Sequence, residues 1–148
     1  MRALGVDLGS KRIGVALSSG SLATPFEVLP RSGDRRRDHR RLAELAEEAE
    51  AEVVVVGLPR SLDGGLGPAA RGALDEVDEL AAVVGRPVET WDERLSTVTA
   101  ERSLQEQGLD ARARRRVVDK VAAAVILQSW LDARAHQTLT GQAEEETP

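Results

Sequence analysis

Short apolar runs separated by turn residues mark the N-terminal part of the chain. The runs Ala3 to Val6 and Ile13 to Leu17 are rich in Val, Ile and Leu, and Gly9-Ser10-Lys11 between them has the composition of a turn. These two runs predict a β-hairpin. The segment Pro25 to Leu29 is typical of a third short strand, which Pro30 ends. We therefore expect an antiparallel meander of three strands.

Helical and strand patterns alternate after the meander. Leu42 and Leu45 fall on one face of the segment Asp34 to Glu50, which predicts an amphipathic helix. The run Val53 to Val56 has no polar alternation, as expected for a strand that helices cover on both faces of its sheet. Further helices are predicted at about 68–84, 97–107 and 111–135, and a fifth strand at 87–91.

The order of these segments predicts an α/β fold with a mixed five-stranded sheet. Three hairpin-connected strands are followed by an alternation of helix and strand, which makes the later strands parallel and places helices on both faces. We expect a single domain over residues 1–136. Residues 137–148 are polar and acidic, which is typical of a disordered tail.

Three carboxylates interrupt apolar segments: Asp7 in the first strand, Glu93 after the fifth strand and Asp119 in the last helix. Because a lone buried charge is costly, each needs a partner. Asp92 precedes Glu93, and successive strand residues face opposite sides of a sheet, so only one of the two can join Asp7. The preference of Asp for turns and caps favours Glu93 for the site and leaves Asp92 a supporting part.

A divalent cation explains why three acids from three separate elements would meet. Clustered carboxylates repel one another, and a bound cation removes that cost. Mg²⁺ prefers such oxygen ligands and keeps several waters, which leaves room for phosphate oxygens. One or two such ions support hydrolysis of phosphodiester bonds. Taken singly, Asp7 could instead be held by backbone amides, and Asp119 could form a salt bridge with a nearby basic residue.

The composition excludes several classes of site and indicates where in the cell the protein is expected. The 148 residues include no Cys, which removes disulfides, thiolate zinc sites and Cys nucleophiles. Aromatic residues make up 2% of the chain, so stacking of bases on aromatic side chains is not expected. The longest apolar stretch, Val121 to Leu127, is far shorter than the roughly 20 residues that span a bilayer. Because Met1-Arg2-Ala3 runs straight into a strand pattern, we expect a cytoplasmic protein without membrane association.

Charge is unevenly distributed along the chain. The net charge of -5 argues against a protein that coats nucleic acid through its overall charge. Arginines nevertheless cluster at 31–41 and at 112–120, and guanidinium groups suit bidentate contacts with phosphate. Solvated helix faces explain the two clusters equally well. His39 and His136 match no motif, and we expect them to be exposed and without a role.

Four motifs, in order between residues 3 and 131, resemble those of the YqgF/RuvX family. They are Asp7-x-Gly9-x-x-Arg12-x-Gly14, Gly57-Leu58-Pro59, Asp92-Glu93-Arg94-Leu95-Ser96-Thr97 and Asp119-Lys120-x-Ala122-Ala123-x-x-Ile126-Leu127-Gln128. The resemblance implies a ribonuclease H-like fold and a bacterial cytoplasmic nuclease that matures the 5′ end of pre-16S ribosomal RNA. An older assignment for the same family is Holliday junction resolvase.

The resemblance also implies roles for the residues at the motif positions. The metal-binding catalytic acids, with Mg²⁺ or Mn²⁺ as cofactor, would be Asp7, Glu93 and Asp119. Contacts with phosphate, or orientation of the acids, would come from Arg12, Arg94 and Lys120. The glycine-rich segment with Gly64 and Gly65 resembles a flexible family segment whose bare backbone amides could approach a substrate phosphate. A plain surface loop explains this segment as well.

The sequence leaves other functions open. An actin-like or sugar-kinase-like ATP-binding domain shares the pattern Asp7-Leu8-Gly9-Ser10, but such proteins close two domains around the nucleotide, and 148 residues supply about one. A non-catalytic RNA-binding factor of ribosome assembly would use the basic clusters and not the acids. No residue pattern reports a contact with a 2′-hydroxyl, so RNA and DNA are not distinguished. A junction resolvase requires a symmetric dimer, whereas the sequence is compatible with a monomer or a homodimer.

Overall fold

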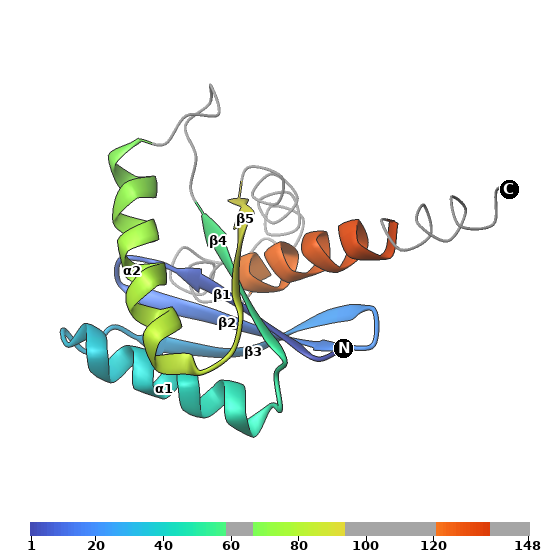
Figure 1. Ribbon diagram of the computed structural model, residues 1–148, viewed down its shortest axis with the longest axis horizontal. Coiled ribbons are helices and arrows are strands. Elements are labelled where there is room, and N and C mark those ends of the chain that lie inside the picture. The colour runs from blue at the N-terminus through green and yellow to red at the C-terminus, as the bar shows by residue number, and fades with distance from the viewer. Residues whose placement is uncertain (59–66, 94–120, 137–148) are drawn as a thin grey trace, which may run out of the picture.

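The computed structural model describes residues 1–58, 67–93 and 121–136, which form one mixed sheet with helices against it (Figure 1). The strands are β1 (Ala3–Leu8), β2 (Arg12–Ser19), β3 (Leu22–Pro30), β4 (Val53–Leu58) and β5 (Val88–Asp92). The helices are α1 (Arg35–Glu48) and α2 (Pro68–Val84), followed after β5 by a helical segment at 121–136.

The sheet has the predicted topology. Its strand order is β3-β2-β1-β4-β5. β1 pairs antiparallel with β2, and β2 with β3, whereas β1 pairs parallel with β4, and β4 with β5. The predicted meander followed by parallel strands is therefore confirmed. β1 lies at the centre of the sheet, between β2, which follows it directly in the sequence, and β4, which comes after α1.

Two apolar layers hold the helices against opposite faces of the sheet. Alternate residues of β1 and β4, among them Leu4 and Val54, pack with Leu42 and Leu45 of α1 and with Leu80 of α2. The other face packs against the 121–136 segment, and the two sets of helices lie on opposite sides in Figure 1. The residues in this second layer are Ala3, Ala16, Val53, Val55, Ala123, Ala124, Ile126, Leu127 and Trp130.

The 121–136 helix approaches the sheet closely where two strands carry glycine. A Cβ added at Gly5 of β1 would lie 2.7 Å from Leu127 Cβ and 3.0 Å from the Ala123 carbonyl oxygen. A Cβ added at Gly57 of β4 would collide with the end of the Ile126 side chain. The absence of side chains at these two positions therefore sets how near the helix can lie to β1 and β4.

The ends of α1 and α2 have favourable local chemistry. Asp34 caps α1, since its side chain accepts hydrogen bonds from the backbone N–H groups of Arg36 and Arg37 at 3.1 and 3.3 Å. Pro68 occupies the first turn of α2 after Gly67. Gly85, with φ of 66°, ends α2 in the left-handed conformation.

One strand differs from its prediction. β3 begins at Leu22 and not at Pro25, because it stays paired with β2 through the register Ser19↔Leu22. As an edge strand it is largely exposed, so its first residues lack the apolar alternation that would reveal them. The predicted helix at 97–107, the first part of the helix predicted at 111–135 and the predicted tail at 137–148 lie outside the described residues. Within the described part of the chain, no helix is long and apolar enough to cross a membrane.

Candidate active site

Asp7 lies near the end of the central strand and faces the layer that contains the 121–136 helix. Side chains alternate along a strand, so Asp7 shares the side of Ala3 and Gly5, both of which contact that layer. Asp7 is half-buried and lies opposite Gly14 of β2 in the antiparallel register. Gly14 therefore places no side chain of β2 beside the Asp7 carboxyl group.

Odd-numbered residues of β5 face the same helix. Trp91 Nε1 donates a hydrogen bond to Ser129 Oγ at 3.0 Å, and Glu89 Oε2 accepts one from Trp130 Nε1 at 2.6 Å. Glu93 directly follows β5, and its side chain is joined to that of Asp7 by a hydrogen bond. The structure therefore brings together two acids that lie far apart in the sequence, across the intervening strand β4.

The surroundings of Glu93 favour its protonated form. Burial is the largest influence and raises the pKa of Glu93 above the usual range, the hydrogen bond with Asp7 lowers it in part, and the negative charge of Asp92 raises it again. Two carboxyl groups share a hydrogen bond only while one of them keeps a proton. The pair Asp7 and Glu93 is thus a site of crowded negative charge, and a cation would relieve this crowding.

Asp92, the last residue of β5, lies next to Glu93, and its supporting part in the site stays a prediction. It lies opposite Leu58 at the end of the parallel register between β4 and β5, and its charge acts on Glu93. The described ranges 1–58, 67–93 and 121–136 contain no cluster of three or more His, Cys, Asp or Glu side chains arranged to hold a metal. The third predicted acid, Asp119, lies outside these ranges.

The predicted basic residues and the glycine loop are placed only in part. Arg12 is the first residue of β2, is half-buried and lies opposite Pro30 of β3, at the same end of the sheet as Asp7. Four further residues are predicted to contact nucleic acid. These residues, Arg94, Lys120, Gly64 and Gly65, lie outside the described residues.

The turn between Asp7 and Arg12 is tight and requires glycine. The Gly9 backbone N–H donates to the Asp7 carbonyl at 3.0 Å, and a Cβ at Gly9 would collide with the Arg12 carbonyl oxygen. Arg31, directly after β3, stabilises the same turn with two hydrogen bonds. Its Nε donates to the Gly9 carbonyl at 2.9 Å, and its backbone N–H donates to the Lys11 carbonyl at 2.9 Å. The backbone that carries Asp7 is therefore held on both sides of Gly9.

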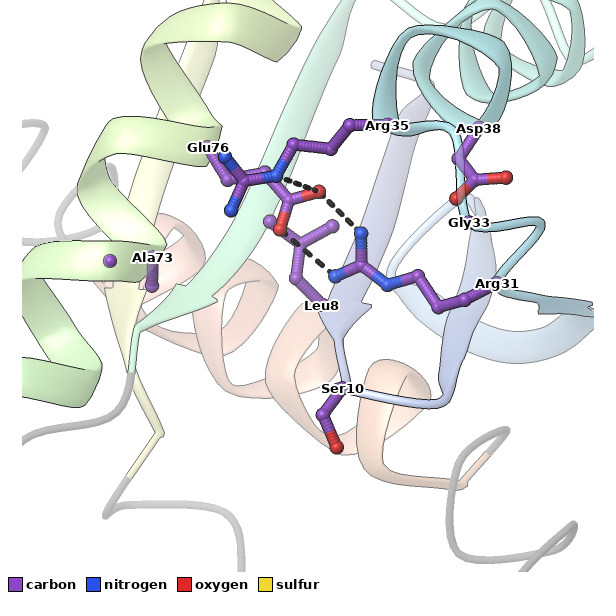
Figure 2. A pocket seen from close by; sticks show the side chains of 9 residues that line it. Leu8, Ser10, Arg31, Gly33, Arg35, Asp38, Ala73 and Glu76 are labelled. Atoms are coloured by element: carbon purple, nitrogen blue, oxygen red, sulfur yellow. Dashed lines mark hydrogen bonds and ion pairs between the residues drawn. The ribbon is translucent and has the colours of Figure 1, made fainter.

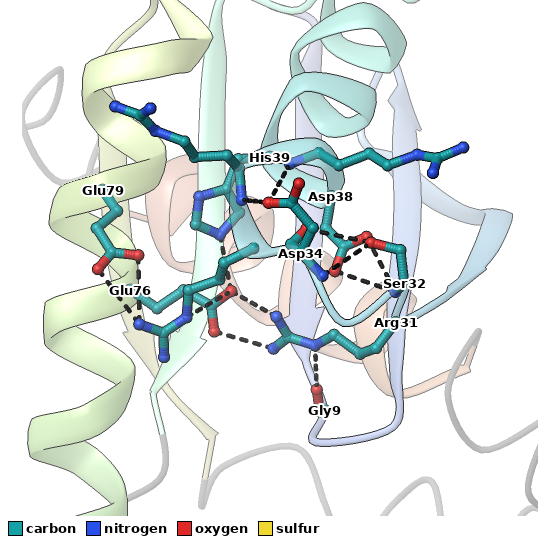
Figure 3. A network of polar contacts seen from close by, with 11 residues as sticks. Gly9, Arg31, Ser32, Asp34, Asp38, His39, Glu76 and Glu79 are labelled. Carbon is teal, nitrogen blue, oxygen red and sulfur yellow. Dashed lines mark hydrogen bonds and ion pairs between the residues drawn. The ribbon is translucent and has the colours of Figure 1, made fainter.

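Arg31 connects this turn to α2 and, through it, to α1 (Figure 3). Its Nη1 and Nη2 atoms donate to the two Glu76 carboxylate oxygens at 2.6 and 2.9 Å. His39 Nε2 lies 2.7 Å from Glu76 Oε2. The expectation that His39 is exposed is wrong: its exposed fraction is 1%, because it lies on the same helix face as Leu42, three residues later. That spacing is the sequence signal that would have placed it in the core.

A cavity of about 600 Å³ lies beside this network, between the β1–β2 turn and the two helices (Figure 2). Arg31 and Arg35 both point toward Glu76 in this view, and Leu8 and Ser10 form the side of the cavity near the turn. Burial alone would raise the pKa of Glu76, but its hydrogen bonds with Arg31 and His39 and the charges of Arg31 and Arg35 hold that pKa below the usual range. The positive charges of Arg31 and Arg35 in this cavity are compensated by the negative charges of Asp38 and Glu76. Leu8 contributes to the cavity and points to the face of the sheet opposite to the one that Asp7 faces, so the cavity and the acid pair lie on different faces.

The fold is shared with a solved structure. The chain aligns with T. thermophilus RuvC in complex with a Holliday junction substrate at a TM-score of 0.58, covering 92% of this chain and 96% of that one. The sequence identity is 21%, so this likeness shows the fold alone. It agrees with the ribonuclease H-like arrangement expected from the sequence.

Sequence relatives are much closer. A protein of Mycobacterium sp. (strain KMS) named "Putative pre-16S rRNA nuclease" is 52% identical over 136 residues, which cover 90% of this chain and 80% of the relative. A protein of the same name from Mycobacterium ulcerans (strain Agy99) is 52% identical over 144 residues, covering 95% and 82%. A family model described as "RuvX: Holliday junction resolvase" matches residues 1–133. The chain therefore belongs to the RuvX family.

Proposed function

We propose that this protein is a nuclease that hydrolyses phosphodiester bonds with the help of a divalent cation, Mg²⁺ or Mn²⁺. The observation that carries the proposal is the hydrogen-bonded pair of carboxyl groups, Asp7 from the central strand and Glu93 from the end of β5. Such a pair offers hard oxygen ligands and gains from neutralisation by a cation. Asp119, which the family motif supplies, is proposed as the third acid.

Each residue of the site has a proposed part in this chemistry. Asp7 and Glu93 would hold the cation, and both carboxyl groups would then be ionised, because a cation favours their charged form and the shared proton would be released to solvent. When bound, the cation supplies an activated water and offsets the charge that develops on the leaving oxygen. Arg12 lies at the same end of the sheet, where its guanidinium group would contact a substrate phosphate.

The proposed substrate is the 5′ region of precursor 16S ribosomal RNA, in the cytoplasm. Support comes from relatives that carry this substrate in their names and match 90% and 95% of the chain at 52% identity. The proposal therefore places the protein in ribosome biogenesis.

A second candidate substrate is a four-way DNA junction. The family description names a Holliday junction resolvase, and the structure with the same fold contains such a junction. Cutting two strands of a junction in concert requires two sites related by symmetry, and so a dimer. Paired incisions by a protein that sediments as a dimer would favour this candidate over the ribosomal one.

The test of catalysis is the variant Asp7→Asn, which keeps the size of the side chain and removes its charge. We expect the cleavage rate with Mg²⁺ to fall on the order of 10³-fold or more, while nucleic-acid binding stays near that of the wild type. Asp78→Asn, at an exposed position of α2, is the matched control and should cleave normally. Undiminished cleavage by Asp7→Asn would falsify the catalytic assignment.

The test of substrate compares three nucleic acids under one set of conditions: precursor 16S ribosomal RNA, unstructured single-stranded RNA and a four-way DNA junction. Each is incubated with Mg²⁺, with Mn²⁺ and with a chelator. Cleavage of the precursor at its 5′ side, dependent on the metal, is the expected result. Cleavage of the junction alone would reverse the order of the two candidates.

A further inference from the structure

The first turns of α1 carry arginines that helix stability does not explain. Arg35, Arg36 and Arg37 open the helix, where the macrodipole is positive and cations are unfavourable. The N-terminal backbone groups cannot themselves hold an anion at Arg36 and Arg37, because both N–H groups already donate to Asp34. Another use for the side chains is needed to account for this placement.

The arginines of α1 divide into two groups by their partners. Arg35 reaches Glu79 at 3.3 Å and Glu76 at 3.8 Å, and Arg41 reaches Glu44 at 3.1 Å. In contrast, three exposed arginines have no acidic group within 4.0 Å anywhere in the described part of the chain. These three, called here the arginine patch, are Arg36, Arg37 and Arg40.

The arginine patch is a single surface on the outer side of α1. At 100° per residue, Arg36, Arg40 and Arg37 fall within an arc of about 100° on the side opposite the buried face of His39 and Leu42. Side chains of a helix lean toward its N-terminus. The guanidinium groups are therefore directed toward the beginning of α1.

The beginning of α1 lies at the end of the sheet where Asp7 lies. β3 ends opposite Arg12, and α1 starts within a few residues of that point, while Arg31 in between is bonded to the β1–β2 turn. In Figure 1 the β1 arrow points toward the side where α1 begins. Lys11, exposed in the β1–β2 turn at this end of the sheet, adds a positive charge there.

We infer that the arginine patch binds the phosphate backbone of the nucleic-acid substrate at a distance from the bond that is cut; the inference rests on the proposed nuclease function. With a net charge of -5 the protein repels a polyanion overall, so a local group of guanidinium side chains without acidic partners decides where the backbone can approach. Their planar groups suit bidentate contact with phosphate.

The positions of Asp7 and of the arginine patch restrict the class of substrate. Asp7 faces the 121–136 helix, whereas α1 covers the opposite face of the sheet. A nucleic acid that reaches both must extend beyond the cleavage position and pass over the β1–β2 turn. The favoured substrate is therefore one with a long flank on one side of the cut, and not a short fragment that ends near it.

The test is equilibrium binding of the full chain in a chelator, so that no cleavage occurs, at several salt concentrations. The probes are a fluorescent RNA hairpin with a long single-sided flank, the same hairpin without the flank, and a four-way DNA junction. The triple variant R36Q/R37Q/R40Q should lower the slope of log K against log[salt] by about 2 for the flanked RNA, since each lost phosphate contact removes about 0.7 to 0.9. Without the flank the slope should not change.

Arg41→Gln is the control for each single substitution of the triple variant, because it removes one guanidinium charge from the same helix at a residue already paired with Glu44. Its slope should stay near that of the wild type. In cleavage assays the triple variant should raise KM for the flanked RNA about tenfold or more with kcat within about twofold.

The inference is overturned if the triple variant, shown by circular dichroism to be folded, keeps the wild-type slope, or if Arg41→Gln lowers the slope as much. A change with the junction and not with RNA assigns the arginine patch to DNA. Binding is measured without metal, so failure of the proposed nuclease activity and failure of this binding surface are separate results. If the protein never cleaves but shows the expected slopes, the arginine patch still stands as a binding site.

Discussion

Glu76 shows how a buried charge is tolerated in this protein. Its exposed fraction is 4%, and a lone carboxylate so placed would be strongly destabilising. Arg31 satisfies both of its oxygens, His39 adds a third contact, and the paired charges also raise the pKa of Arg31. Because each partner depends on the other, removing one leaves an uncompensated group in the interior.

The variant Glu76→Gln is expected to reduce the free energy of unfolding at pH 7 by about 3 kcal/mol, because the Arg31 guanidinium loses its buried partner. The folded-state pKa of Glu76 is lower than its unfolded value, so the carboxylate stabilises the protein above the unfolded pKa and this contribution is lost as the pH falls through the folded pKa. The difference between the two proteins should therefore shrink on acidification. Urea unfolding at a series of pH values measures it.

Glu79→Gln is the control for this prediction. Glu79 pairs with Arg35 at 3.3 Å but its side chain is 52% exposed, so its loss should cost no more than about 0.5 kcal/mol. Equal costs for the two substitutions, or a difference that is independent of pH, would contradict the importance of the buried pair.

The sequence revealed the acids of the site more readily than the network behind it. Asp7 and Glu93 each interrupt an apolar pattern, and the structure joins them by a hydrogen bond; their catalytic role stays a prediction. Arg31, in contrast, looks like one member of a solvated basic cluster. Its contacts run to Gly9 and to Glu76, which is 45 residues away, and a pairing over such a separation leaves no periodic signal.

At the scale of elements, the 121–136 helix depends on one glycine in each of two strands that it packs against. Gly5 allows the backbone of this helix to come near β1, and Gly57 receives the Ile126 side chain against β4. Ile126 and Leu127 are fully buried there. This contact fixes the helix on the side of the sheet where Asp7 and Glu93 face, so its distance from the strands bears on the site as well as on the core.

A series of glycine replacements tests this contact. Gly5→Ala should destabilise most, by about 2 to 3 kcal/mol, because the new methyl group meets Leu127 Cβ and the Ala123 carbonyl oxygen, which cannot move without the helix. Gly57→Ala should cost less, since the tip of a flexible Ile side chain can move aside. Gly72→Ala, in open space within α2, should instead stabilise by about 0.5 to 1 kcal/mol.

Thermal or urea unfolding of the three variants gives the order directly. A Gly5→Ala protein as stable as the wild type would show that the helix does not pack as closely on β1 as described.

Elements with a strong apolar period were predictable, and exposed ones were less so. The four consecutive Val residues of β4 are all buried, and the neighbours of this strand on both faces are the helices that this pattern implied. β3 was recognised from its apolar end but not from its first residues, because an exposed edge strand is defined by hydrogen bonds with its neighbour and not by burial.

The whole molecule is a three-layer arrangement whose central sheet gathers the proposed site at one end. Strands β1 and β5 contribute one acid each, with β4 between them. A ligand held by both strands would be bound by the folded chain and not by the unfolded one. Binding of the proposed cation should therefore be visible as a change in the stability of the entire domain.

Mg²⁺ at ten times its dissociation constant is expected to add about 1.4 kcal/mol to the free energy of unfolding, which corresponds to a rise in Tm of about 3 to 6 °C for a domain of this size. Asp7→Asn should lose most of this rise, whereas Asp78→Asn should keep it. Differential scanning calorimetry in chelator and in Mg²⁺ measures both. A rise of equal size in Asp7→Asn would place the cation elsewhere.

The position of β1 between β2 and β4 also sets the order in which the molecule can assemble. The hairpin of β1 and β2 closes over a three-residue turn, so it can form as soon as that part of the chain is available. The pairing of β1 with β4, and then of β4 with β5, must wait for two helical crossovers. Asp7 and Glu93 meet only after these slow, non-local steps, so a chain still emerging from the ribosome lacks the proposed acid pair until its sheet is complete.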